Sequence, residues 1–406
     1  MLMLSWEYPP RVVGGISSHV RDISAALARR GNVVHVVTPE FPGAPSEEKV
    51  PEGNGFVAVH RVEVYDTLAP DFPTWVSLMN ASLERRAISL FKEEPFDVVH
   101  AHDWLVAEAA IGLKHIYRRP LVATVHATER GRRGGIFSQL SAHIDQEERW
   151  LVSEAWKVIV CSWSMYGQVE DLGAFHDKIW RIPNGVWPQQ FQQPRQPDFR
   201  KRFASDDEKL VLFVGRLVQE KGVVFLLKAF PKVLESFRAK LVIVGDGYLK
   251  QPLQDMAYQM GVGQQVYLTG FLDEQEKRAL YSSADVLVVP SLYEPFGIVA
   301  LEGMASGVPV VVSNVGGLGE IVEHDRNGVL VYPGDPASIA WGILHVFLNP
   351  EGAKKLTENA RRDVEQIYSW ERIAGETVRL YRQVGEEYAS GSWKPRGFPP
   401  PSFDFR

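Results

Sequence analysis

The chain has 406 residues, of which 45% are hydrophobic and 23% charged, and its formal net charge is -6. This length suits two or three globular domains, and the interspersed charges form no basic stripe, which argues against a nucleic-acid partner. The single cysteine, Cys161, excludes a disulfide and a cysteine metal cluster and favours a reducing, cytoplasmic location. No apolar stretch reaches the roughly eighteen residues of a membrane span, so we expect no membrane partner. Composition leaves the oligomeric state open.

In the first half of the sequence, short runs rich in Val, Ile and Leu alternate with helix-length amphipathic segments. After an opening strand in "MLMLS", these runs are "VVHVVTP" from residue 33, "FDVVHAH" from 96, "LVATVHA" from 121 and "KVIVCS" from 157. Continuous apolar runs suit strands covered on both faces, as in a parallel sheet with crossover helices. We therefore predict a first Rossmann-like domain over residues 1–188.

The pattern breaks at about 184–208, where Pro, Gln and charged residues indicate a connection. It restarts with "LVLFVGR" from 210, "KLVIVGDG" from 240, "QVYLTG" from 265, "ADVLVVPS" from 284 and "VPVVVSN" from 308. These runs predict a second Rossmann-like domain over 189–370. Residues 371–406 are predicted to form a helix that packs back on the first domain, followed by a loose tail rich in Pro and Gly.

The predicted fold class is α/β, with two doubly wound domains that face each other across a cleft. Ligands of open α/β sheets bind outside the carboxyl ends of the strands. Residues that directly follow the predicted strands are therefore the candidates for a site.

Four segments of the first half carry such candidates. Gly14 and Gly15, in "YPPRVVGGISSHV", allow the backbone to approach a phosphate closely. Asp103, in "HAHDWL", is either a cleft residue or a helix N-cap. His126 ends "LVATVH" and either faces the cleft or lies in the core. Arg132, in "ATERGRRGG", either lines an acceptor channel or belongs to a solvated loop.

In the second half, "EPFGIVALE" places Glu294 and Glu302 around an expected helix start near Pro295. The two carboxylates would then be roughly 12 Å apart along the helix, comparable to a nucleoside diphosphate sugar. One could bind sugar hydroxyls and the other a ribose; alternatively, Glu294 only complements the helix dipole and Glu302 faces solvent. Free backbone amides between them would bind a diphosphate. They belong to Phe296, Gly297 and Ile298.

Two further turns follow strands of the second half. "VGRLVQEKG" carries Arg216 and Lys221, two cations that suit a diphosphate unless the loop is merely solvated. "VGDGYLK", with Gly245 and Gly247, lacks the third glycine of a dinucleotide fingerprint. We predict a tight turn beside the nucleotide base there.

Taken together, these segments resemble the retaining glycosyltransferases of the GT-B fold, in particular the large bacterial family 4 with its sucrose-, trehalose- and glycogen-synthase-like members. The resemblance rests on "EPFGIVALE" and "GRLVQEKG" and extends over most of the chain, to about residue 388. In starch and bacterial glycogen synthases of a neighbouring family, a lysine stands two positions before the paired glycines, where this chain has Val12. This departure favours family 4 over an ADP-glucose synthase.

The resemblance implies roles for the donor-side residues. Arg216 and Lys221 would bind the donor diphosphate, and the loop with the paired glycines would close over the donor. "PNGVW", with Asn184, would form the floor of the cleft. The second domain would bind the nucleotide sugar. No metal ion or other cofactor is expected, because the two cations and the helix amides would neutralise the leaving diphosphate.

For the first domain, the resemblance implies an acceptor-side role. His126 would contact the transferred sugar, and Asp103 would lie near the sugar or the acceptor. The predicted catalytic set is His126, Arg216, Lys221 and Glu294.

The predicted activity is transfer of a sugar such as glucose, with retention of configuration, from a nucleoside-diphosphate sugar to a soluble acceptor hydroxyl. UDP-glucose or ADP-glucose would be the donor, and a sugar or oligosaccharide such as an α-glucan the acceptor. The alternatives are a sugar-nucleotide epimerase, a mannosyl- or glucosyltransferase with a lipid-linked acceptor, and a non-catalytic sugar-nucleotide sensor.

Overall fold

The computed structural model describes residues 1–64 and 69–393, which form two compact units. The first unit contains Met1–Val160, Gln168–Trp180 and the residues from Ala374 onward, and the second contains Cys161–Gly167 and Arg181–Ile373. The predicted boundary after residue 188 differs from this division, because 161–167 and 181–188 belong to the second unit. Most of the predicted tail lies outside the described residues.

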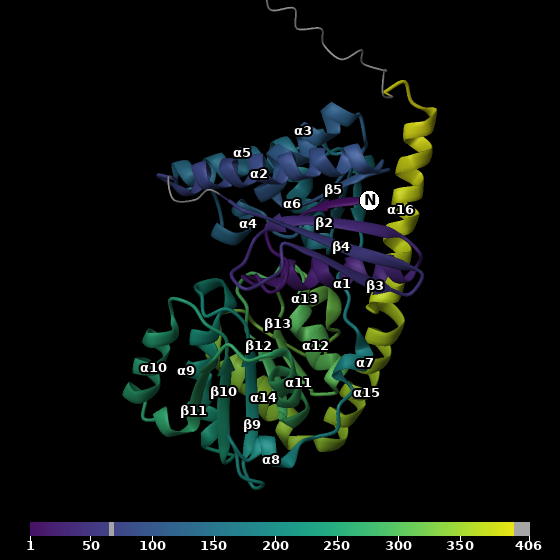
Figure 1. Ribbon diagram of the computed structural model, residues 1–406. Helices are drawn as coiled ribbons and strands as arrows, with labels where there is room; N and C mark the ends of the chain where they lie inside the picture. The colour runs from purple at the N-terminus through teal and green to yellow at the C-terminus, as the bar shows by residue number, and fades with distance from the viewer. Residues whose placement is uncertain (65–68, 394–406) are drawn as a thin grey trace, which may run out of the picture. The chain divides into compact units, whose positions relative to one another are not determined.

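The first unit is built on an eight-stranded sheet in the order β3-β4-β2-β1-β5-β6-β7-β8. Figure 1 labels four of these strands, β2, β3, β4 and β5. Strands β1, β2, β4, β5, β6 and β7 pair in parallel. The predicted apolar runs form β1, β2, β5, β6 and β7, whereas β4 was not predicted; β6 and β7 are buried throughout. The strands are β1 Leu2–Leu4, β2 Val33–Pro39, β3 Glu47–Glu52, β4 Gly55–Val62, β5 Val99–His102, β6 Leu121–Val125, β7 Lys157–Val160 and β8 Ile179–Arg181.

Strand β3 was not expected from the sequence. It pairs antiparallel with β4, and its residues alternate between exposed and half-buried. Its sequence "EEKVPE" contains no apolar run because only one side of this edge strand packs on the unit. Edge strands with charged side chains are common, since the charges prevent pairing with other chains.

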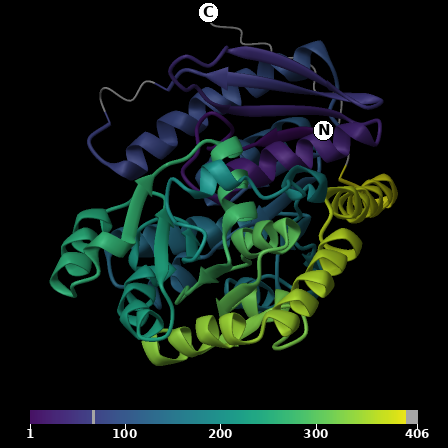
Figure 2. The ribbon, with the colours of Figure 1, turned by 90° about the horizontal axis from the view of Figure 1, so that it is seen from below.

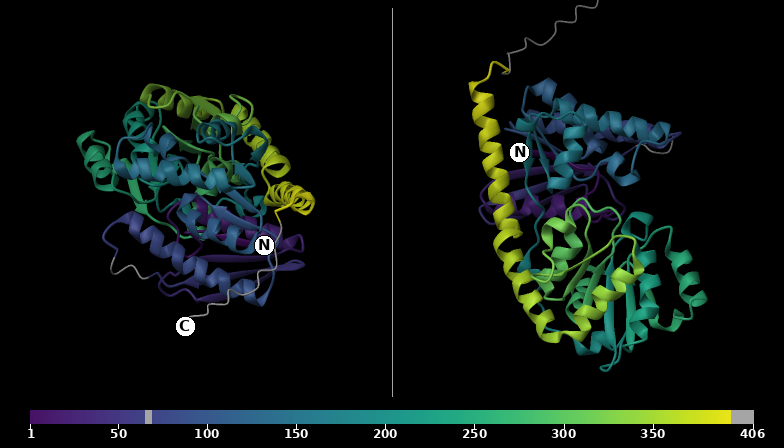
Figure 3. Two further views of the ribbon diagram at one scale, coloured as in Figure 1. Left: turned by 90° about the horizontal axis from the view of Figure 1, so that it is seen from above. Right: turned by 180° about the vertical axis from the view of Figure 1, so that it is seen from behind.

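The helices of the first unit connect its parallel strands, as the alternating pattern predicts (Figures 1 and 3). They are α1 Gly15–Arg29, α2 Phe72–Glu93, α3 Ala107–Tyr117, α4 Glu129–Arg133 and α5 Gln139–Glu154. Helix α6, Trp163–Asp171, and helix α16, Trp370–Ser390, each have residues in both units.

The second unit is built on a six-stranded sheet in the order β11-β10-β9-β12-β13-β14, and its strand pairs are parallel. Strand order therefore reverses between β9 and β12, as in a doubly wound dinucleotide-binding fold. The predicted strands are present, with β14 in addition. They are β9 Lys209–Val214, β10 Ala239–Val244, β11 Val266–Gly270, β12 Val286–Val289, β13 Val310–Ser313 and β14 Val329–Val331.

Helices cover both faces of this sheet because alternate strand residues point to opposite sides. Val211 and Phe213 join a core with Phe230 of α9, whereas Leu287 and Val310 lie against Gly303 of α12. The helices are α7 Pro188–Phe191, α8 Pro197–Arg200, α9 Val223–Leu234, α10 Lys250–Gln259, α11 Glu274–Ser283, α12 Ile298–Ser306, α13 Leu318–Ile321, α14 Pro336–Leu348 and α15 Pro350–Ile367.

Helix α16 follows α15 after two residues, and most of its length belongs to the first unit (Figure 2). Tyr381 Oη lies 2.6 Å from His100 Nδ1, and the Glu387 carboxylate accepts a hydrogen bond from Trp156 Nε1 at 2.7 Å. These contacts attach the helix to β5 and to the start of β7. Among the described residues, no helix is both long and apolar enough to cross a bilayer.

A buried histidine pair on β2 and β4 makes the stability of the first unit depend on pH. His35 Nδ1 lies 3.0 Å from His60 Nε2, and Glu94 Oε1 lies 3.0 Å from His35 Nε2. Burial, together with the nearby His60, lowers the pKa of His35 from 6.5 to about 4. The unfolded chain therefore takes up a proton at this site at a higher pH than the folded chain does.

We predict that lowering the pH from about 6.5 to about 4 reduces the free energy of unfolding by up to about 2 kcal/mol through this site. His35→Gln should flatten this dependence, because glutamine does not titrate. Urea denaturation at several pH values measures the slope, with the exposed His115→Gln as the control. An unchanged slope in His35→Gln would contradict the assignment.

Candidate active site

The structure brings together two predicted residues where the strand order of the second unit reverses. Lys221 lies on the loop after β9 and Glu294 on the loop after β12. Lys221 Nζ is 2.8 Å from Glu294 Oε2, and Ser291 Oγ donates to the same oxygen at 3.0 Å. Both charged side chains are partly buried, with 21% and 12% of their surfaces exposed. Ion pairs in such an environment are screened less by solvent than surface pairs.

Backbone packing fixes the two loops against each other. Gly222 has a φ of +65°, and a Cβ atom there would lie 2.0 Å from the carbonyl oxygen of Pro290. The amides of Leu292 and Tyr293 donate to the carbonyl of Glu220 at 2.8 and 3.3 Å. Only glycine tolerates both this backbone conformation and this approach, so Gly222 holds Lys221 beside Glu294.

The predicted helix start at Pro295 is wrong. Helix α12 begins at Ile298, and Gly297 before it has a left-handed φ of +115°. Glu294 therefore lies on a loop, and the estimate of the separation from Glu302 along one helix does not apply. Among the described residues, the amides of Phe296, Gly297 and Ile298 donate to no protein acceptor. They remain available to a ligand at the start of this helix.

Sequence reasoning missed Ser162, which holds this loop, and Glu320, which holds the residues after Ser162. Ser162 Oγ donates to the carbonyl of Pro295 at 2.7 Å, and Glu320 accepts the amides of Trp163 and Ser164 at 2.9 and 3.0 Å. Ser162 follows β7 after one residue, so its place after a predicted strand could have indicated it. Glu320 lies on α13, and its partners are more than 150 residues away in the sequence.

Glu302 is enclosed by two side chains of α11. The residue is 8% exposed, its Oε1 lies 3.1 Å from Lys277 Nζ, and its Oε2 accepts from Tyr281 Oη at 2.7 Å. Burial and the Glu302 charge raise the pKa of Tyr281 well above its usual value. Burial alone would lower the pKa of Lys277, but Glu302 and Glu274 raise it. Lys277 and Tyr281 were not predicted, and the reading in which Glu302 faces solvent is wrong.

Three other donor-side predictions also lie in the second unit. The Arg216 side chain is 43% exposed, and its Nη2 atom lies 3.1 Å from Glu220 Oε1. Gly245 has a φ of +130°, and a Cβ there would lie 1.9 Å from the carbonyl oxygen of Gly215, so the turns after β9 and β10 pack backbone to backbone. Asn184 is buried in the second unit.

In the first unit, the glycine loop is held by a glutamate that was not predicted. Glu7 Oε2 accepts the amides of Val13 and Gly14, each at 2.8 Å. Gly14 precedes α1, and Gly15 is the first residue of that helix. The amide of Gly14 is thus engaged within the protein.

Asp103 and His126 are directly linked. Asp103 follows β5 with a φ of +63°, and its Oδ1 accepts the backbone amide of His126 at 2.6 Å. Its side chain makes no N-cap hydrogen bond, so the N-cap alternative is wrong. Burial raises the pKa of Asp103 to about 7.

Arg132 lies on α4. Its Nη1 atom is 3.8 Å from Glu129 Oε2, and 34% of its side-chain surface is exposed.

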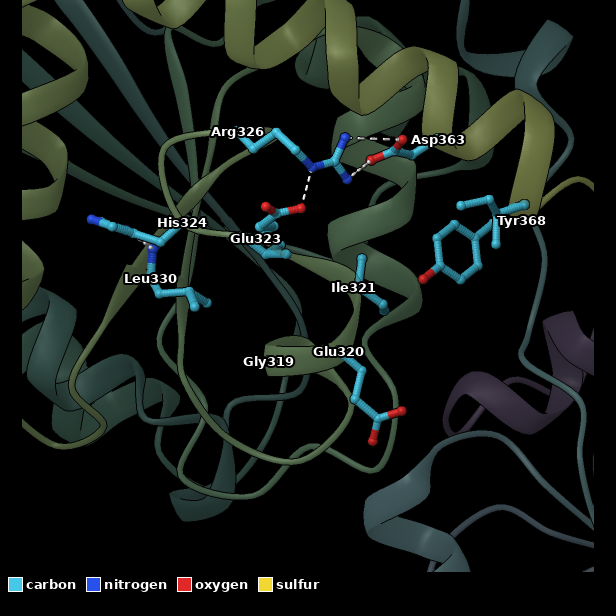
Figure 4. A pocket seen from close by; sticks show the side chains of 11 residues that line it. Gly319, Glu320, Ile321, Glu323, His324, Arg326, Leu330, Asp363 and Tyr368 are labelled. Atoms are coloured by element: carbon cyan, nitrogen blue, oxygen red, sulfur yellow. Dashed lines mark hydrogen bonds and ion pairs between the residues drawn. The ribbon is translucent and has the colours of Figure 1, made fainter.

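A separate cavity of about 340 Å³ lies in the second unit and contains none of the predicted site residues (Figure 4). Arg326 lies between Glu323 and Asp363, and the Asp363 carboxylate is 2.6 Å from Arg326 Nη2 (Figure 4). Asn327 Nδ2 also donates to Asp363, at 2.7 Å. These polar side chains contact one another and attach α15 to the loop before β14. We therefore assign them a structural role.

Comparisons with known proteins identify the family. Residues 13–190 match the family model "Glycosyltransferase Family 4", and residues 194–363 match "Glycosyl transferases group 1". An uncharacterized glycosyltransferase of Methanocaldococcus jannaschii is 42% identical, over 94% of this chain and 97% of that protein. The chain is a family 4 glycosyltransferase. A glycogen synthase of Mycobacterium tuberculosis is 37% identical to this glycosyltransferase, over 94% of each chain.

Solved structures agree with the fold. The sucrose-phosphate synthase of Thermosynechococcus elongatus superposes with a TM-score of 0.81, at 25% identity, over 94% of this glycosyltransferase and 98% of the synthase. The two parallel-sheet units thus form a GT-B fold, and the predicted fold class is confirmed. The family assignment made from "EPFGIVALE" and "GRLVQEKG" is also confirmed.

We predict that Glu302 stabilises the second unit of this glycosyltransferase. Glu302→Gln leaves Glu274 as the remaining carboxylate partner of Lys277. This change should reduce the free energy of unfolding by about 2 kcal/mol. The expected loss is smaller than for a fully buried ion pair, because the side chains of Glu302 and Lys277 keep some exposure. The double variant Glu302→Gln/Lys277→Gln should lose less than the sum of the single variants. Urea denaturation measures both effects, with Glu274→Gln as the matched control. Wild-type stability of Glu302→Gln would show that the contact is not structural.

Proposed function

We propose that this glycosyltransferase transfers glucose, with retention of configuration, from a nucleoside-diphosphate glucose to a hydroxyl of a soluble oligosaccharide acceptor such as an α-glucan. The observation that carries the proposal is the Lys221–Glu294 pair beside the unengaged amides of Phe296, Gly297 and Ile298. A cation and helix-start amides suit a diphosphate, and an adjacent carboxylate suits sugar hydroxyls. The similarity to a glycogen synthase and to a sucrose-phosphate synthase supports glucose as the sugar.

The chemistry requires stabilisation of charge on the leaving diphosphate. Glycosyl transfer passes through an oxocarbenium-like state, in which negative charge grows on the departing phosphate. Lys221, Arg216 and the amides before α12 would supply the compensating charge, so the proposal needs no metal ion or other cofactor for this step. Glu294, released from Lys221 when a diphosphate binds there, would accept hydrogen bonds from the sugar.

The remaining predicted residues complete the proposal. Each carboxylate oxygen of Glu302 has a second lone pair, so the group could accept ribose hydroxyls while Lys277 and Tyr281 orient it. His126 would contact the transferred sugar, and Asp103 and Arg132 would act on the sugar or acceptor. We also propose that the protein acts in the cytoplasm without a membrane or nucleic-acid partner.

The donor is tested by adding UDP-glucose, ADP-glucose, GDP-glucose and GDP-mannose separately to the purified protein and measuring the thermal unfolding midpoint. We expect one or two of the glucose donors to raise it. Maltooligosaccharides are then supplied with that donor, and NMR of the anomeric proton gives the configuration of the product. An inverted product, or epimerisation of the donor without an acceptor, would refute the proposal.

We predict that Lys221→Ala lowers kcat by about 100-fold or more, which corresponds to about 3 kcal/mol of transition-state stabilisation. The donor KM should change much less, because the charge on the phosphate grows only as the bond breaks. Steady-state kinetics with the donor found above measures both values. Lys232→Ala, an exposed lysine on α9 of the same unit, is the control. An unchanged kcat in Lys221→Ala would remove this residue from the mechanism.

A further inference from the structure

Three histidines from separate elements of the first unit converge at one edge of its sheet. His19 lies on α1, which follows β1; His102 is the last residue of β5; and His126 directly follows β6. Strands β1, β5 and β6 are neighbours in the sheet. The three histidines therefore meet at the carboxyl ends of adjacent parallel strands, although their positions in the sequence give no metal-binding motif.

Their spacing suits a single ion. One ring nitrogen from each histidine lies within 4.8 Å of the other two, and His102 Nδ1 is 3.2 Å from His126 Nε2. Zinc holds imidazole nitrogens at about 2.0–2.1 Å in a tetrahedral arrangement, which places two ligand nitrogens about 3.3 Å apart. His102 and His126 already have this spacing. The His19 ring lies edge-on to both, with centroid distances of 5.4 Å to His102 and 4.6 Å to His126.

The chemistry of these imidazoles also suits a metal ion. Neutral imidazole is the commonest metal ligand in proteins, through either ring nitrogen. The Nε2 atom of His102 is buried and, among the described residues, has no hydrogen-bond partner. His19 and His102 are buried, and His126 is half-buried. His100 stacks on His102, but both of its nitrogens are engaged, with Tyr381 and Thr124.

We propose that His19, His102 and His126 form a binding site for one divalent transition-metal ion of the zinc type, with its fourth coordination position open. Soft-to-borderline ions prefer imidazole, whereas magnesium prefers oxygen ligands. The ion has no part in neutralising the leaving diphosphate, which is assigned to the second unit. Because His126 is also the residue proposed to contact the sugar, the ion and the sugar compete for the same imidazole.

The site is tested on tag-free, full-length protein that has been treated with a chelator and passed over a desalting column. Cobalt(II) is added in steps while visible absorption is recorded, and elemental analysis gives the bound metal per chain. We expect one cobalt ion per chain, with the intense d–d absorption of a four-coordinate site, and its displacement by zinc(II). Magnesium should not compete.

Variants show whether these residues hold the ion. His126→Gln and His19→Gln should each weaken cobalt binding at least tenfold and abolish the four-coordinate spectrum, with circular dichroism confirming the fold. His115→Gln, in an exposed histidine of the same unit that pairs with Glu154, is the matched control and should bind as wild type. The absence of stoichiometric cobalt, or an unchanged spectrum in both variants, would overturn the proposal.

A second measurement separates this proposal from the proposed function. The affinity for UDP, measured by calorimetry, should be the same with and without zinc, because the groups assigned to the diphosphate belong to the second unit. Binding of UDP without any binding of cobalt would refute the metal site and leave the proposed function intact. Binding of cobalt without any binding of a nucleotide sugar would support the metal site and refute the proposed function.

Discussion

The ion pair between Lys221 and Glu294 is the interaction around which the site of the second unit is arranged. Its partners are 73 residues apart in the sequence and meet because the strand order reverses between β9 and β12. A diphosphate that takes over the Lys221 ammonium group would release the Glu294 carboxylate for hydroxyl groups. Replacement of the Glu294 carboxylate by a diphosphate as the partner of Lys221 would therefore couple binding of the diphosphate to orientation of the sugar. Little movement of the backbone would be needed, because Gly222 fixes both loops.

Much of this arrangement follows from the sequence because it is encoded locally. Continuous apolar runs such as "LVLFVG" and "DVLVVP" form buried parallel strands, and parallel sheets place the residues that follow each strand at one edge. Lys221 and Glu294 could be predicted for that reason. The strand β3 could not, because "EEKVPE" belongs to an exposed edge and has no apolar run.

The errors have a common physical origin in contacts between distant segments. The helix start at Pro295 was plausible on local propensity, but Gly297 adopts a left-handed conformation in which Gly316 and Gly317 pack against the loop. The enclosure of Glu302 depends on Lys277 and Tyr281 of α11, which precede it by more than twenty residues. The boundary predicted after residue 188 lies close to the limit between the two family models, and the composition of the sequence does not reveal that 161–167 pack in the second unit through Ser162 and Glu320.

The two units offer different chemistry to a substrate. The second presents a lysine and backbone amide donors, and these groups suit a diphosphate. The first presents neutral imidazoles at His102 and His126 and a carboxyl group at Asp103 whose pKa is raised to about 7. Groups of this kind exchange hydrogen bonds with uncharged hydroxyls, and the imidazoles can equally bind a soft cation. If both proposals hold, His126 would serve either a sugar or a metal ion, and selectivity between the two would rest on whether His19 and His102 close around the ion.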